Sequence, residues 1–179
     1  YTVSEYDLSQ SIKYGQKNEL IVRIGSEFSS VPEFIPVGAD LEKRGWFPGI
    51  WDSVSLVHTG ETTIVRTKVE TDIDTNQINV LTTIKNSSKQ PTDILLTQQV
   101  AEWQSKAAFG LANETTLTLQ PQETKIVEQF ISIESPQLWS PESPFLYSVT
   151  TNLTANGIVS DDRVTRFGMR KFEWRSGEG

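Results

Sequence analysis

The segment RGWFPGIW, residues 44–51, gathers aromatic side chains in a stretch whose glycine and proline residues favour turns. Trp46 and Phe47 lie outside any alternating pattern, and Arg44 precedes them closely in the sequence. An aromatic ring offers a flat apolar surface that can stack on a sugar, and a guanidinium donates hydrogen bonds that sugar hydroxyls can accept. We therefore predict that Arg44, Trp46 and Phe47 bind carbohydrate. A hydrophobic plug at a strand entrance is the alternative for this cluster.

The segment TDIDTNQIN spaces oxygen atoms as a calcium-binding loop does, with Asp72, Asp74 and Asn76 at alternate positions. In such a loop the sixth position is a glycine and the twelfth is a bidentate glutamate. This chain has Gln77 and Thr83 at those positions. A solvated hairpin tip is therefore predicted in place of a metal site. The chain contains no cysteine, which excludes metal sites built on Cys. We predict no metal centre and no cofactor.

Residues that could hydrolyse a substrate are present but are not arranged for it. The single histidine, His58, closes a predicted strand and is more typical of a solvated linker than of a catalytic triad. Asp161 and Asp162 are adjacent in a predicted strand, so they point to opposite faces and are expected at the surface. Glycoside cleavage requires two carboxylates on either side of one bond. The chain has 23 acidic residues, but the sequence singles out no pair of them at the end of a predicted strand. We predict no catalytic residue.

The elements that must position these residues are β-strands, because alternation with a period of two dominates the sequence. An all-β protein is therefore predicted. The clearest strands are expected at residues 19–24, 52–57, 63–70, 77–85, 93–100, 116–119, 125–133 and 145–153. Asn156–Gly157 accepts the positive φ angles of a type I′ turn, so residues 158–167 should pair with the strand before them. Roughly seven strands between Ile64 and Trp174 fit an immunoglobulin-like β-sandwich without its disulfide.

Two segments connect these strands in an unusual way. Residues 135–147, SPQLWSPESPFLY, contain three Ser-Pro pairs and predict a stiff elbow that covers Trp139. Trp103 and Trp174 are interpreted as core or interface residues.

Residues 1–57 offer two or three strands separated by a connection of about 25 residues, which is long for a compact domain. So few strands cannot bury both faces of a sheet, so we interpret this region as part of a larger sandwich.

Composition excludes several partners. The net charge is −7, so nucleic acid is not expected as a partner. No apolar run approaches the ~20 residues that span a bilayer, so no membrane segment is predicted, and the first residues do not resemble a signal peptide. The compartment stays open, and a periplasmic or secreted bacterial enzyme is compatible with the sequence. Triplets that accept glycans only in a secretory host begin at Asn86, Asn113 and Asn152.

Both ends of the chain resemble glycoside hydrolase family 2, which includes β-galactosidases, β-glucuronidases and β-mannosidases. YTVSEYDLSQSIKYGQKNELIVRIGS is similar to the last strands of the family's N-terminal sugar-binding jelly-roll domain, and GWFPGIWDSVSLV to the segment before the domain boundary. Asp52 stands where the family commonly has arginine, so no role of that arginine is carried over. LWSPESPFLY and the run from Arg166 to Arg170, RFGMR, resemble the end of the family's immunoglobulin-like domain. Residues 60–130 match in strand pattern alone.

The resemblance implies a non-catalytic N-terminal region of a β-galactosidase-like exo-glycosidase. Residues 1–58 would be the C-terminal part of the jelly-roll, 59–174 the immunoglobulin-like domain, and 175–179 a truncated tail before the catalytic (β/α)₈ barrel. The family's catalytic glutamates sit on that barrel, so the chain alone is expected to be inactive. Glu19 and Glu114 each follow an asparagine, as the family's catalytic acid does. They are not expected to be that acid, because Glu19 begins a predicted jelly-roll strand and Glu114 lies near a predicted turn.

In the full enzyme the loop with Arg44, Trp46 and Phe47 would help to wall the sugar site, so the expected partners are carbohydrate and the enzyme's own barrel. A free-standing carbohydrate-binding or adhesion module is the alternative. A spacer that holds oligomer contacts is a third interpretation, because unpaired strand edges favour self-association into a homo-oligomer.

Overall fold

The computed structural model describes residues 4–24, 49–50 and 52–173, and it divides the chain into two compact units, Tyr1–Leu56 and Val57–Gly179. Within the described residues there is no helix, and so none that could cross a membrane. The all-β prediction is confirmed for this part of the chain.

The described part of the first unit contains turns and no strand. The Leu8 carbonyl accepts hydrogen bonds from the amides of Ser11 and Ile12, at 2.8 and 3.0 Å, and closes one of these turns. The strand expected at residues 19–24 is not formed, and Leu20 is 64 % exposed. A strand exists through hydrogen bonds to a neighbouring strand, and residues 19–24 have no such neighbour among the described residues. The strand expected at 52–57 is absent for the same reason. The jelly-roll assignment of this region stays a prediction.

The described part of the second unit, residues 57–173, contains seven strands, the number that the sequence pattern predicts. They are β1 (Thr62–Asp72), β2 (Gln77–Asn86), β3 (Thr92–Glu102), β4 (Ala108–Leu119), β5 (Thr124–Ser132), β6 (Tyr147–Ala155) and β7 (Ile158–Phe167). The predicted turn between β6 and β7 is confirmed, because Asn156 and Gly157 have φ angles of 49° and 81°. The prediction for β4 was too short by eight residues, since Gly110 adopts a φ of 67° and the register with β3 shifts there. This irregularity interrupts the alternation on which the prediction relied.

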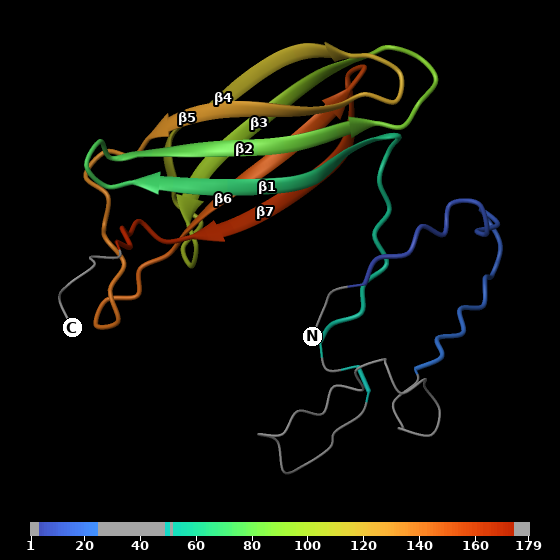
Figure 1. Cartoon of the computed structure of the whole chain (residues 1–179), viewed down its shortest axis with the longest axis horizontal. Coiled ribbons are helices and arrows are strands. Elements are labelled where there is room, and N and C mark those ends of the chain that lie inside the picture. Colours follow the sequence, from blue (N-terminus) through green and yellow to red (C-terminus); the bar gives the residue numbers. More distant parts are fainter. Residues whose placement is uncertain (1–3, 25–48, 51, 174–179) are drawn as a thin grey trace. The chain divides into compact units, whose positions relative to one another are not determined.

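The strands form two antiparallel sheets in the order β1-β2-β5 and β4-β3-β6-β7. Figure 1 shows β1, β2 and β5 side by side, with β6 and β7 passing behind them. The start of β1 also ties the two sheets together: its Ile64 amide donates to the Asp161 carboxylate of β7 at 2.7 Å, and the Ser160 hydroxyl donates to the Thr62 carbonyl at 2.6 Å. Asp161 was predicted at the surface; it is half-buried, because it bonds this edge.

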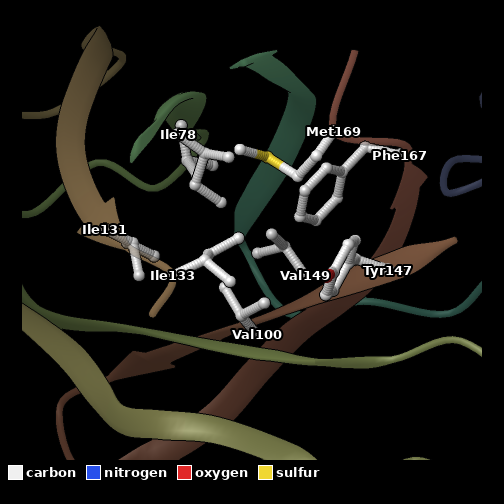
Figure 2. Close-up of a cluster of buried hydrophobic side chains, with 9 residues drawn as sticks. Ile78, Val100, Ile131, Ile133, Tyr147, Val149, Phe167 and Met169 are labelled. Carbon is white, nitrogen blue, oxygen red and sulfur yellow. The ribbon is translucent and has the colours of Figure 1, made fainter. Parts of the chain in front are cut away.

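Apolar side chains from both sheets fill the space between them in two clusters. The first cluster lies toward the ends of β6 and β7 where Tyr147 and Phe167 are found (Figure 2), and it contains Ile78, Val80, Val100, Ile131, Ile133, Tyr147, Val149, Phe167 and Met169. The second contains Ile64, Ile84, Ile94, Leu96, Leu119, Val127 and Leu153. Two sheets with a shared core confirm the β-sandwich that alternation predicts.

Candidate functional site

The residues predicted to bind carbohydrate, Arg44, Trp46 and Phe47, lie outside the described residues, so their role stays a prediction. Trp51 and Trp174 lie outside them as well. Within the described part of the chain, no group of three or more His, Cys, Asp or Glu residues could hold a metal ion.

The calcium-like segment forms the tip of the β1–β2 hairpin, as predicted. The Asp72 carboxylate accepts hydrogen bonds from the amides of Asp74 and Thr75, at 2.9 and 3.2 Å, and so closes the turn on itself. The Thr75 hydroxyl, these two amides and the charge of Lys171 lower the pKa of Asp72. Its oxygens therefore stabilise the turn, and Asn76 adopts the positive φ, 55°, that completes it.

The last described residues, 168–173, which we call the exit segment, are fixed to this hairpin tip. The Thr71 hydroxyl of β1 donates to the Arg170 carbonyl at 2.9 Å. The Lys171 ammonium pairs with Asp74 at 2.9 Å and with Glu173 at 2.8 Å. Hydrogen bonds to these two carboxylates raise the pKa of Lys171. The exit segment thus leaves the sandwich in a direction that β1 helps to set.

The predicted elbow, residues 135–147, ends at the first residue of β6 and also holds the exit segment. Leu138 and Met169 form a parallel β-bridge, and the Trp139 amide donates to the Met169 carbonyl at 2.9 Å. The Arg170 guanidinium lies 5.1 Å from the centre of the Trp139 ring. A Cβ atom at Gly168 would lie 3.1 Å from Trp139 Cβ, so a glycine permits this close approach. Trp139 is half-buried rather than covered by the elbow, because one side of its ring faces Arg170.

A second tryptophan–arginine pair lies at the end of β3. The half-buried Trp103 has the Lys106 ammonium 4.0 Å and the Arg166 guanidinium 5.3 Å from its ring centre. Such contacts are attractive because the face of an aromatic ring is negative. Both arginines of the RFGMR run therefore stack on tryptophans that are distant in the sequence. This pairing was not predicted, since spacing along one strand cannot identify partners on other segments.

Tyr147, at the start of β6, anchors the elbow to the core. Its hydroxyl accepts a hydrogen bond from the Gln137 amide at 2.7 Å. Burial raises the pKa of this phenol, the Gln137 hydrogen bond lowers it, and the charge of Glu102 raises it. Tyr147 ends the LWSPESPFLY run, but the sequence does not predict its hydroxyl contact, because the partner is a backbone amide.

A shallow depression of about 660 Å³ lies at the β6–β7 turn, and three of the polar residues that line it form hydrogen bonds with one another. The Thr118 hydroxyl donates to the Asp93 carboxylate at 2.6 Å, and the Asp93 amide donates to Asn156 Oδ1 at 3.2 Å. No aromatic residue lines this depression. It therefore lacks the stacking surface that the predicted carbohydrate site would have.

One of the three glycosylation triplets is built into the core. Asn86 is 0 % exposed, and its Nδ2 donates to the carbonyls of Gln90, Gln120 and Leu119 at 2.9, 3.2 and 3.4 Å. A glycan could not be attached to this nitrogen unless the turn around Gln90 and the turn after Leu119 both opened. Asn113 also uses its Nδ2, which donates to the Phe130 carbonyl at 3.1 Å.

Curated relatives match almost the whole chain but are much longer. The chain is 27 % identical over 182 residues to a β-galactosidase of Thermoanaerobacter pseudethanolicus, which covers 98 % of this chain and 23 % of that protein. It is 23 % identical over 194 residues to the β-galactosidase BoGH2A of Bacteroides ovatus, covering all of this chain and 20 % of that protein. The chain thus spans about a fifth of the length of these relatives.

Solved structures share the fold. A family 2 glycosyl hydrolase of Bacteroides cellulosilyticus aligns over 63 % of this chain and 16 % of its own, with a TM-score of 0.57 and 24 % identity. A putative β-galactosidase of Bacteroides fragilis aligns over 68 % and 19 %, with a TM-score of 0.56 and 25 % identity. The family model described as "Glycosyl hydrolases family 2" matches residues 61–170, which include all seven strands and both stacked arginines. The chain belongs to glycosyl hydrolase family 2.

Proposed function

We propose that this chain is the N-terminal, non-catalytic part of a β-galactosidase-like glycosidase. Residues 59–174 act as an immunoglobulin-like domain that orients a catalytic (β/α)₈ barrel, and residues 175–179 lead toward it. Residues 1–58 belong to a sugar-binding jelly-roll. Family membership and the β-galactosidase names of two relatives, each about five times longer, support this proposal.

The observation that carries the proposal is the way residues 168–173 are held. Thr71 and Asp74 of the hairpin, and Leu138 and Trp139 of the elbow, all bond the exit segment. A chain fixed at so many points transmits the orientation of the sandwich to whatever follows it. A scaffold requires such fixed contacts, whereas the carboxylates that cleave a glycosidic bond would lie on the barrel.

An activity comparison tests the proposed function. The 179-residue chain is expected to release no nitrophenol from nitrophenyl β-galactoside, and a longer polypeptide that carries this sequence and the barrel is expected to release it. Hydrolysis by the chain alone would overturn the scaffold role. In calorimetric titration with oligosaccharides the chain alone should give no binding heat, because the sugar site is completed by the barrel. Binding would favour a free-standing carbohydrate-binding module.

Trp46→Ala in the longer enzyme tests the proposed sugar wall. Loss of a ring that stacks on substrate should lower kcat/KM about 10-fold or more, which corresponds to about 1.4 kcal/mol of transition-state binding. Trp46→Phe is the matched variant and should retain most of the activity, because it keeps an aromatic face. Equal kcat/KM values for the alanine variant and the wild type would show that Trp46 does not contribute to the sugar site.

A further inference from the structure

A layer of polar side chains crosses the middle of the sandwich between the two apolar clusters. Thr67 of β1 and Thr82 of β2 are register partners in one sheet, and Gln98 of β3 and Thr151 of β6 are register partners in the other. On β3, Gln98 lies between the buried Leu96 and Val100, which belong to different clusters. We call these four residues, Thr67, Thr82, Gln98 and Thr151, the polar layer.

One direct hydrogen bond joins the two halves of the polar layer. Gln98 Nε2 donates to Thr82 Oγ1 at 2.8 Å, and this bond crosses from one sheet to the other. Thr82, Gln98 and Thr151 are each 0 % exposed. Bulk water therefore cannot solvate their polar atoms.

Three oxygen atoms of the polar layer have no hydrogen-bond partner among the described residues. They are Thr67 Oγ1, Gln98 Oε1 and Thr151 Oγ1. Buried polar atoms are nearly always satisfied by protein or by ordered water, since desolvating them without a partner is unfavourable.

We propose that the polar layer is a binding site for an internal water molecule, held by Gln98 Oε1 and the Thr151 hydroxyl. Register partners in antiparallel strands have Cα atoms about 5 Å apart, so these two side chains lie close enough to share one ligand. A buried water needs two to four polar partners, and Thr67 or Thr82 across the sandwich can complete the set. The water would extend the Gln98–Thr82 bond into a wider link between the sheets.

Oxygen-17 relaxation dispersion of solutions of the 179-residue chain tests this proposal, because it detects intact water molecules held by the protein and ignores exchanging hydroxyl protons. The variant Gln98→Met/Thr151→Val keeps the side-chain volumes but removes both proposed ligands. Its dispersion amplitude should fall by the contribution of one water molecule. Thr151→Ser retains the hydroxyl and should keep the wild-type amplitude.

An unchanged amplitude in a folded double variant would overturn the proposal. If the double variant does not fold, Thr151→Val alone is measured, and its amplitude should fall by the same amount. A high-resolution crystal structure of the wild-type chain gives an independent result. Electron density for a water within hydrogen-bonding distance of Gln98 and Thr151 is expected, and a dry contact at this position would also refute the site.

Discussion

Tyr147→Ala is expected to lower the free energy of unfolding by about 3–5 kcal/mol, the range observed when a buried aromatic side chain is removed. Tyr147 is 1 % exposed, and its ring packs against three other aromatic rings (Figure 2 shows that of Phe167). The ring centres of Phe145, Phe109 and Phe167 lie 4.9, 5.2 and 5.5 Å away. Urea unfolding followed by tryptophan fluorescence measures the loss. Tyr6→Ala is the control, because Tyr6 is 81 % exposed and should change stability by less than about 0.5 kcal/mol.

Tyr147→Phe separates the ring from the hydroxyl. It keeps the packing but leaves the Gln137 amide without its acceptor, so a loss of about 1–3 kcal/mol is expected. The raised pKa of Tyr147 means that the unfolded chain releases the phenol proton first as the pH rises above about 10. Stability therefore falls in that range in the wild type, and it should fall less in Tyr147→Phe. If the alanine variant lost no more than the phenylalanine variant, the aromatic cluster would not stabilise this end of the sandwich.

The strands of the second unit could be predicted because burial on one face imposes a period of two on the sequence. β3 reads Ile94, Leu96, Gln98, Val100 on its buried face, and one polar residue does not hide the pattern. Because a single inward-facing polar residue does not disturb the alternation, the sequence does not reveal the polar layer. A threonine or glutamine at an inward position looks like an exposed residue until the register of four strands places it opposite others.

The predicted strand at residues 19–24 shows the opposite limit. Leu20, Val22 and Ile24 alternate as a strand should, yet they are exposed in the structure. Alternation records which face of a segment can be buried, whereas a strand also needs a neighbour for its backbone hydrogen bonds. The sequence therefore predicts a tendency in this region, and the pairing that realises it depends on other segments.

The stacked arginines could be located in the sequence but not interpreted there. Arg166 and Arg170 stand in the RFGMR run, whereas their partners Trp103 and Trp139 lie at the end of β3 and in the elbow. Only the pairing of β6 with β3 and β7, together with the Leu138–Met169 bridge, brings them together. Such contacts join residues that are far apart in the sequence, so no pattern within a single segment identifies the residues that make them.

Asn86→Asp is expected to destabilise the second unit by about 3–5 kcal/mol near neutral pH, as when a charge is buried without a partner. The side chain of Asn86 joins two turns by donating to three carbonyls and by accepting from the Ser88 amide at 3.0 Å. A carboxylate at this position has no proton to donate, and it would place negative charge against the carbonyl oxygens. Desolvation and this repulsion would raise its pKa above the unfolded value of about 3.9.

The pH dependence of Asn86→Asp distinguishes this cause from a simple loss of packing. In the window between the unfolded pKa and the raised folded pKa, the folded variant binds more protons than the unfolded chain, so its stability falls as the pH rises. The difference from wild type should therefore be smallest below about pH 4 and should reach its full size above the folded pKa. Asn113→Asp is the matched control, because that half-buried side chain donates a hydrogen bond to a single carbonyl, that of Phe130. It should cost about 1 kcal/mol with little change across pH. A penalty for Asn86→Asp that is the same at pH 4 and pH 8 would show that the buried donors of Asn86, rather than the new charge, decide the stability of these two turns.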